Sequence, residues 1–284
     1  MNTPKVSGFT IARNAVKFNY PLVESIQSIL PICDEFIVNV GDSEDETLRL
    51  VQSIKSPKIR IIQNTWDFSQ GPEVLSFQTN LALKACRGTW AFYLQSDEVV
   101  HEKDLPKIKK MMARYENDAN IDVFRFRWFH FYGSYFRYRI DEGWYQKQDR
   151  IVRNNGTIES FGDAFSFRRK DGQKLRRVNT WCFIYHYGWV QSHEVMAERR
   201  RNAEKIGFDS LKENEGQGAH NYANLEQFPV YTGSYPAVMK DRITSHQVSQ
   251  GDLVRINWQN WWNLLWLLKV RVKTGLRTRQ EIKK

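Results

Sequence analysis

The chain has 284 residues, 41% of them hydrophobic and 14% aromatic, which excludes a wholly disordered polypeptide and suffices for a large core. The formal net charge is +10, but residues 269–284 alone carry +6, so the first 268 residues hold only an ordinary excess. Three scattered cysteines, Cys33, Cys86 and Cys182, argue against a disulfide framework or a zinc site. The N-terminus has no apolar run of signal-peptide length, and we expect a cytoplasmic protein with reduced cysteines.

The first hundred residues alternate between apolar runs and amphipathic segments. They predict strands at 6–11, 35–40, 58–63 and 90–94, and helices at 20–30, 43–54 and 73–86. Ser43 and Glu46 have the spacing of a capping box for the second helix. This order predicts an α/β fold with a mostly parallel sheet and helices on both faces. Ligands of such sheets bind beyond the carboxyl ends of the strands, so four segments should converge: residues 12–14, 41–43, 64–68 and 95–98.

The remainder of the chain has a different pattern. After a predicted helix at 102–115, residues 122–132 alternate apolar and polar side chains, which is typical of a strand with one polar face. Further strands at 149–153, 164–167 and 181–187 predict an antiparallel extension joined to the edge of the first sheet. A charged helix at 192–206 precedes residues 214–233, whose Gly, Asn, Gln and Tyr content indicates a linker or loop.

Two groups of carboxylates follow predicted strands. Residues 42–46 hold four carboxylates in five positions. Helix capping, at about 0.3–1 kcal/mol per charge, explains the last three equally well, whereas Asp42 lies nearest the strand end. Asp97 and Glu98 come directly after the apolar run 90–94. One or two carboxylates plus substrate phosphates are the usual ligands of Mg²⁺, so this pair is a candidate metal site, with an exposed acidic turn as the alternative.

Three polar residues are candidates for ligand binding. Arg13 and Asn14 follow the first predicted strand, where an arginine can pair with phosphate in a bidentate manner. A surface cation explains Arg13 equally well. Asn80 lies in the third predicted helix, where a polar side chain can position a ribose or a base, or simply face solvent.

Four segments together resemble the family-2 glycosyltransferases of the GT-A type: residues 10–14, 34–47, 80–88 and 93–98. The resemblance implies the GT-A fold and places residues 96–98 at the family's Asp-x-Asp metal motif, with Asp97 and Glu98 binding Mg²⁺ or Mn²⁺. Gln95 stands in place of the first aspartate, and a neutral amide is a poorer ligand, so the need for a metal stays open. The nucleotide-sugar contacts implied are Arg13, Asn14, Asp42, Asn80, Gln95 and Ser96.

The second half is more loosely similar to bacterial transferases of lipopolysaccharide-core and related sugars. Residues 149–154 match their basic strand, which assigns phosphate contacts to Arg150 and Arg153. Asp163 falls in their short acidic motif, where Gly162-Asp163 replaces His-Glu; it is the candidate catalytic base, with Glu159 as second choice. His186, in the equivalent of a His-Tyr pair, becomes a metal ligand beside Asp97. The alternatives are a charged strand face for the arginines and a core histidine for His186.

The sequence therefore predicts an inverting glycosyltransferase that acts on a saccharide or lipid-linked acceptor of the bacterial cell surface. We expect a nucleotide-sugar half (1–100), a catalytic and acceptor half (101–212), a loop-rich segment (213–250), and a Trp-rich amphipathic helix with a basic tail (251–284). The helix lacks about 20 uninterrupted apolar residues, so it either lies on an anionic membrane surface, at the inner face, or packs on the domain.

Two other functions stay open. Gln95 is also compatible with a non-catalytic protein that binds nucleotides or sugars. The positive charge and many aromatics are typical of RNA-binding modules, but most of that charge is terminal and no RNA-recognition signature is present, so no nucleic-acid partner is expected. Nucleotidyl transfer is disfavoured because residues 12–15 form no Gly-rich basic loop.

Overall fold

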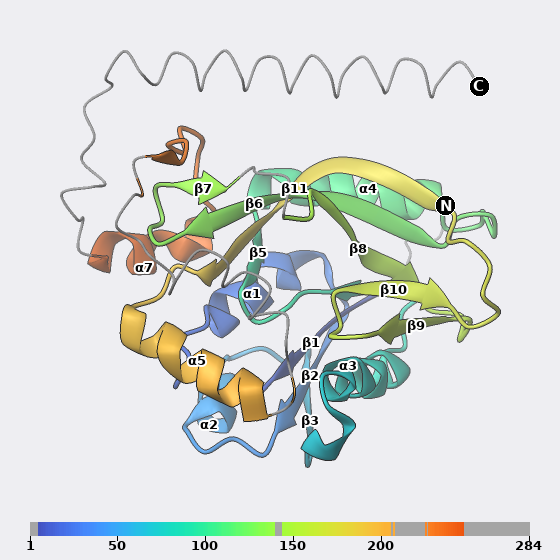
Figure 1. The fold of residues 1–284 in the computed structure, drawn as a ribbon. Coiled ribbons are helices and arrows are strands. Elements are labelled where there is room, and N and C mark those ends of the chain that lie inside the picture. The colour runs from blue at the N-terminus through green and yellow to red at the C-terminus, as the bar shows by residue number, and fades with distance from the viewer. Residues whose placement is uncertain (1–4, 140–143, 206, 208–224, 226, 247–284) are drawn as a thin grey trace.

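The structure is a computed structural model that describes residues 5–139, 144–205, 207, 225 and 227–246 (Figure 1). The predicted Trp-rich helix and basic tail lie outside the described residues, as do residues 213–224, 226 and 247–250 of the loop-rich segment. The first half contains β1 (Val6–Ala12), α1 (Leu22–Ile29), β2 (Glu35–Gly41), α2 (Thr47–Gln52), β3 (Ile59–Asn64), α3 (Glu73–Ala85) and β4 (Trp90–Tyr93).

The second half is richer in strands. It contains β5 (Glu98–Val100), α4 (Leu105–Arg114), β6 (Val123–Tyr132), β7 (Tyr138–Arg139), β8 (Lys147–Arg153), β9 (Ile158–Phe161), β10 (Ser166–Arg169), β11 (Arg177–Trp189), α5 (His193–Lys205) and α7 (Lys240–Ser245). None of the helices in the described part of the chain is long and apolar enough to cross a membrane.

The first four strands form the predicted parallel sheet in the order β3-β2-β1-β4. β1 pairs in parallel with β2 on one side and with β4 on the other. Their carboxyl ends therefore lie at one edge, as the alternation of strands and helices predicts. α2 is shorter than expected because no capping box forms at its start. The Ser43 hydroxyl instead accepts a hydrogen bond from the Asn14 amide and donates one to the Gly41 carbonyl at the preceding turn. Asp45 accepts a hydrogen bond from the Thr47 amide at 2.9 Å.

The second half continues the same sheet from β4 in the order β8-β6-β11-β5. β8 is antiparallel to β4 and to β6, as expected for an antiparallel extension. β11 departs from this expectation because it runs parallel to β6. The hairpin β9–β10 and the connection after it bring the chain back to the start of β6, where β11 begins. The hairpin is a separate two-stranded sheet beside α3, so the strand expected at 164–167 does not join the main sheet (Figure 1).

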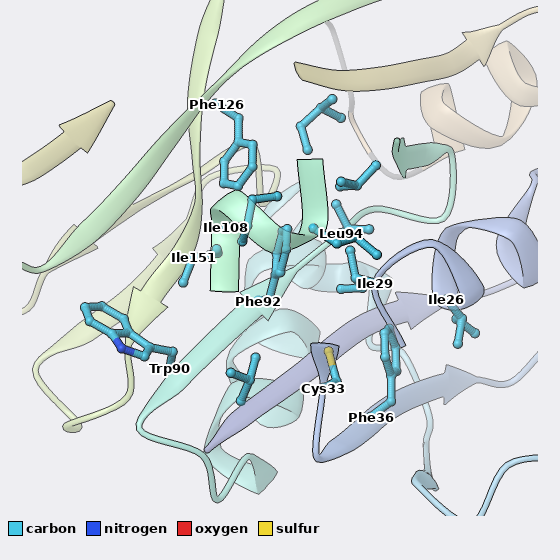
Figure 2. Packing of buried hydrophobic residues seen from close by; sticks show 14 of the residues in the cluster. Ile26, Ile29, Cys33, Phe36, Trp90, Phe92, Leu94, Ile108, Phe126 and Ile151 are labelled. Atoms are coloured by element: carbon cyan, nitrogen blue, oxygen red, sulfur yellow. The ribbon is translucent and has the colours of Figure 1, made fainter. Parts of the chain in front are cut away.

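Two apolar clusters cover the two faces of the sheet. On one face, Ile26 and Ile29 of α1 and Ile108 of α4 pack against Phe36 and Phe92 of the sheet (Figure 2). On the other face, α3 and the β9–β10 hairpin pack over β1 and β4, through Val74, Ala82, Ile158, Phe167, Phe9 and Tyr93. Burial of these faces, at about 25 cal/mol per Å² of apolar surface, fixes the sheet that carries the site.

Candidate functional site

The ends of β1 and β2 are joined by polar contacts. Asn14 is buried with a positive φ of 53°, its Oδ1 accepts from the Glu44 amide at 2.8 Å, and its own amide donates to Ser43 Oγ at 3.2 Å. Arg13 donates to the Asp42 carbonyl at 3.2 Å and lies 4.6 Å above the Phe68 ring. Arg13, Asn14 and Asp42 are therefore brought together, as predicted, and the Asp42 carboxylate is 47% exposed at this edge.

The segment after β4 is tied to three neighbouring elements. Ser96 Oγ donates to the Ile11 carbonyl of β1 at 2.8 Å, and Ser25 Oγ of α1 donates to the Gln95 carbonyl at 3.0 Å. The Gln95 side chain donates to the Ala164 carbonyl at 3.4 Å. The segment is thus fixed against β1, α1 and the turn between β9 and β10, where the Gln95 side chain contacts the residue that follows Asp163.

Asp97 faces a pair of buried histidines. His186 Nε2 lies 3.4 Å from Asp97 Oδ2, and His186 Nδ1 lies 3.1 Å from His130 Nδ1. Burial alone would raise the pKa of Asp97, but the charges of His186 and Arg199 outweigh it and leave the pKa below its ordinary value. Asp97 is therefore an ionised carboxylate in a shielded position, the state that a cation requires of a ligand.

Gly188 lets the backbone approach this carboxylate closely. A Cβ at Gly188 would lie closer than 3.0 Å to both Asp97 Oδ2 and His186 Nε2. An oxygen and a nitrogen atom thus pack together against the Gly188 backbone, and any larger residue would push them aside. Within the described ranges, no three His, Cys, Asp or Glu side chains gather to hold a metal by themselves. Asp97 and His186 are the residues here that would hold a divalent cation, with its other ligands supplied by substrate phosphates and water.

Glu98 and Arg150 are not available for the roles expected of them. Arg150 donates to both Glu98 oxygens, Nε to Oε2 and Nη2 to Oε1, each at 2.8 Å, and both side chains are fully buried. Arg150 Nη1 also donates to the Phe165 carbonyl at 2.9 Å. Glu98 as a metal ligand and Arg150 as a phosphate contact are therefore both wrong, because each side chain neutralises the other inside the sheet.

Asp163 lies at the tight turn between β9 and β10. Burial raises the pKa of its carboxyl above the ordinary aspartate value, opposed by the Phe165 amide and the charge of Arg150. A carboxylate with a raised pKa is a stronger base near neutral pH. Glu159, the second choice, is paired with Arg168 at 2.9 Å on the hairpin strand. Asp163 is therefore the better placed of the two candidate bases.

The family profile described as glycosyl transferase family 2 matches residues 9–176 of this chain, more than half of its length. The chain belongs to glycosyl transferase family 2. With the mixed sheet observed, membership confirms the expected GT-A fold. No sequence among the curated proteins matches this chain.

Solved structures of TarS from S. aureus are similar to this family-2 chain. TarS 1–349 in complex with UDP has 21% identity over 45% of this chain and 36% of its own, with a TM-score of 0.35. The complex with UDP-GlcNAc has the same identity, share of this chain and TM-score, over 34% of that chain. TarS 1–349 alone has 15% identity over 90% of this chain and 77% of its own, with a TM-score of 0.43. The chain thus spans about a third of the two nucleotide-bound structures.

Two residues assigned by family resemblance lie elsewhere or do other work. The Asn80 side chain donates to the Ser160 carbonyl at 2.9 Å and accepts from the Ser160 amide at 2.7 Å, so it fastens α3 to β9. Arg153 pairs with Trp90, at the start of β4 rather than at its carboxyl end. Its guanidinium donates to four carbonyls around the end of α4, those of Tyr115, Glu116, Asp118 and Ile121. Both side chains are therefore engaged with backbone groups in this structure.

Tyr145 and His130 are site residues that the sequence reasoning missed. The Tyr145 phenol interacts with the charges of Glu98, Arg150 and Asp97, and burial followed by these acids raises its pKa. The Tyr145 carbonyl lies 2.9 Å from His130 Nε2. His130 belongs to the alternating pattern of β6, on the same side as Trp128, and that alternation would have placed it on the buried face. Its partner His186 lies on β11, which no local pattern pairs with β6.

Proposed function

We propose that the protein transfers a sugar from a nucleoside-diphosphate sugar to an acceptor hydroxyl, with inversion at the anomeric carbon. The observation that carries this proposal is the approach of Asp97 and His186 to each other against the Gly188 backbone, in a segment whose Gln95 side chain contacts the turn that holds Asp163. A shielded carboxylate–imidazole pair suits a cation at the diphosphate, and a carboxyl with a raised pKa suits the acceptor proton. Family membership supports the same reaction class.

The chain's own residues would act as follows. The acceptor oxygen forms a bond to the anomeric carbon while the bond to the diphosphate breaks, and the electron pair leaves with the diphosphate. Asp163 takes the acceptor's proton, a contribution of about 10²–10⁴-fold to the rate. A divalent cation, when bound by Asp97 and His186, neutralises charge that grows on the leaving diphosphate. Gln95 and Ser96, fixed by backbone contacts, shape the wall of this site.

The nucleoside would lie over the ends of β1 and β2. Asp42 is half-exposed there, and Arg13 stacks on Phe68 beside it. An exposed carboxylate can accept hydrogen bonds from a ribose or a base, whereas the Arg13 guanidinium, already bonded to the Asp42 carbonyl, would orient that turn. Asn14 holds the turn from beneath through its bond to the Glu44 amide.

The acceptor and the location are further parts of the proposal. The basic residues of 269–284 and the Trp-rich stretch before them support peripheral attachment to an anionic membrane at its cytoplasmic face, where a lipid-linked or cell-surface saccharide would be the acceptor. Co-sedimentation with vesicles containing phosphatidylglycerol should differ between the full chain and a chain ending at residue 250. Equal sedimentation of the two proteins would refute membrane attachment.

Thermal-shift measurements test the central proposal. UDP and UDP-GlcNAc are the first probes, each with and without Mn²⁺, on the wild type and on Asp97→Ala. We expect a nucleotide to raise the midpoint in a Mn²⁺-dependent way, and Asp97→Ala to remove only that dependence. If no nucleoside diphosphate or nucleotide sugar stabilises the wild type, the transferase proposal fails. Stabilisation by a nucleotide sugar with no release of UDP in the presence of any saccharide would instead favour a non-catalytic binder.

A further inference from the structure

Residues 227–246 connect the second half of the fold with the first. Near β7, the Tyr231 amide donates to the Phe136 carbonyl at 2.8 Å. Further along, the Ala237 amide donates to Glu102 Oε2 at 3.0 Å, just after β5. The segment then forms α7, which is bonded to α1 and to the residues before it. It therefore reaches the half of the protein that holds the proposed nucleoside contacts.

Arg242 of α7 makes this connection with one side chain. Its Nε donates to Glu24 Oε1, in the first turn of α1, at 2.6 Å. Nη1 donates to Asn19 Oδ1 at 2.8 Å and to the Asn19 carbonyl at 3.3 Å, and Nη2 donates to the Tyr20 carbonyl at 3.0 Å. A guanidinium is always ionised, and its planar donors hold several acceptors in fixed positions. Arg242 thus fastens α7 to α1 and to the end of the loop that precedes it.

Asn19 is held from a second direction as well. Its side-chain amide donates to Gln191 Oε1 at 3.2 Å, and the Gln191 amide donates back to the Asn19 carbonyl at 3.2 Å. Gln191 follows the end of β11 by two residues. The backbone of Asn19 has a φ of 50°, a left-handed conformation that asparagine tolerates better than most residues. Asn19 is therefore a junction between α7, the end of β11 and the loop after β1.

The loop between β1 and α1 also bonds the acidic turn after β2. The Ala15 amide donates to Thr47 Oγ1 at 2.7 Å, and the Lys17 amide donates to Asp45 Oδ2 at 2.7 Å. The same turn carries Asp42, the proposed contact of the nucleoside. One end of the loop is thus bonded to the nucleoside side of the site, and the other end is bonded to α7 and to the segment after β11.

We propose that Arg242 is a positioning residue for the nucleotide: by holding Asn19 it fixes the loop between β1 and α1, and through that loop the turn that carries Asp42. This inference rests on the proposed function, because it uses the nucleoside contact assigned there. Arg242 itself touches no substrate. Coupling between two sites of a protein typically changes an affinity by about 5–150-fold, which is the loss expected when the connection is broken.

The first test is calorimetric titration of the full chain with UDP. Arg242→Met should weaken UDP binding by about 5–150-fold. Arg242→Lys should restore little of it, because an ammonium can pair with Glu24 but cannot also hold both Asn19 acceptors in the planar arrangement of a guanidinium. Arg60→Met is the matched control. It breaks a pair with Glu35 of 3.1 Å at the amino ends of β2 and β3, away from the site, and should bind UDP as the wild type does.

Asn19→Gly tests the same junction from its other side. Glycine adopts the positive φ without strain but removes the side-chain bonds to Arg242 and Gln191. UDP binding should weaken, and the double variant Arg242→Met, Asn19→Gly should lose less affinity than the two single losses added together, because both changes break one connection. Fully additive losses would overturn the inference.

The outcomes separate this inference from the proposed function. If neither UDP nor UDP-GlcNAc binds the wild type, both fail. If UDP binds the wild type and Arg242→Met equally well, the nucleotide site stands and the positioning role is overturned. Urea denaturation shows whether each variant is folded. A loss of stability shared by Arg242→Met and Arg60→Met, with UDP affinity reduced in the first alone, would support positioning rather than a general structural effect.

A second test needs no variant. Coupling between two sites is reciprocal, so UDP should in turn strengthen the docking of α7 if Arg242 connects the two. Hydrogen exchange of the peptide that spans residues 240–246 reports this docking. We expect its exchange to slow when UDP is bound to the wild type. Unchanged exchange in α7, with slower exchange in the loop between β1 and α1, would overturn the inference.

Discussion

Glu98 and Arg150 form a doubly hydrogen-bonded ion pair with neither side chain exposed to solvent. Glu98 Oε2 also accepts from the Gln95 amide at 3.1 Å, and the Arg150 guanidinium lies 4.8 Å from the Trp128 ring centre. Burial would lower the pKa of Arg150, but the charge of Glu98 more than compensates and keeps the guanidinium ionised. The pair thus fixes the turn at 95–98 and leaves Asp97 as the acidic residue of that turn that faces His186.

Glu98→Gln should therefore damage stability before chemistry. It leaves the Arg150 charge buried without a counter-ion, and breaking a buried pair in this way costs about 3–5 kcal/mol. Urea denaturation would measure the change in the free energy of unfolding. The double variant Glu98→Gln, Arg150→Met should recover part of the loss, because no uncompensated charge remains. A Glu98→Gln protein of wild-type stability that no longer binds Mn²⁺ would mean that Glu98 is a metal ligand after all.

Gly188→Ala tests the close approach of Asp97 and His186 to the Gly188 backbone. The added methyl group would lie closer than 3.0 Å to Asp97 Oδ2 and His186 Nε2, so the two donors could not share a cation without moving apart. We expect loss of Mn²⁺-dependent stabilisation by UDP, with metal-free UDP binding retained. Calorimetric titration with UDP, with and without Mn²⁺, measures both. Undiminished Mn²⁺ dependence in this variant would show that the cation lies elsewhere.

The sheet's first half was predictable because its information is local. Apolar runs bounded by amphipathic helices specify β1 to β4, and right-handed crossovers then fix their order, so the amino-acid pattern by itself predicts the convergence of Arg13, Asn14, Asp42 and Asp97. The strand at 123–132 was also visible from its alternation, although its partners were not.

What could not be predicted depends on pairing between distant strands. β11 lies parallel to β6, and β5 pairs with β11, so His130, His186 and Glu98 become neighbours through non-local registers that sequence periodicity does not encode. The sequence around Glu98 is the same whether its carboxylate binds a cation or an arginine. Only the position of Arg150 across the sheet distinguishes the two for Glu98.

Arg153→Lys tests the reassignment of Arg153 to stability. Its guanidinium donates to four carbonyls beyond α4 and lies 4.2 Å from the Trp90 ring centre, and a lysine has too few donors to replace these contacts. Each carbonyl left without a partner costs about 1–3 kcal/mol when buried, so urea denaturation should show a loss of that order. UDP affinity should not change. A specific loss of UDP binding at wild-type stability would restore Arg153 as a phosphate contact.

Asp163→Asn is expected to separate activity from stability. The amide cannot accept the acceptor's proton, so kcat/KM for sugar transfer should fall by about 10²–10⁴-fold, with UDP-sugar affinity retained. Glu159→Gln is the matched control, since its carboxylate is occupied by Arg168, and it should lose little activity. If instead Glu159→Gln abolishes transfer and Asp163→Asn does not, the two assignments are reversed.

The pH dependence of the same variant gives an independent check on Asp163. Burial raises the pKa of this carboxyl in the folded protein above the value of about 3.9 expected when unfolded. Folding therefore takes up a proton between those two values, and the wild-type free energy of unfolding falls as pH rises through that window. Asp163→Asn removes this loss, so the variant should gain stability relative to the wild type across the window and keep the gain at pH 7. The acidic limb of kcat/KM in the wild type should lie above about pH 3.9 for the same reason, because transfer needs the ionised base. Urea denaturation of both proteins at about pH 3, below the window, and at about pH 7 measures the difference in the free energy of unfolding. A variant less stable than the wild type at neutral pH would show that the Asp163 carboxylate stabilises the turn rather than serving as the catalytic base.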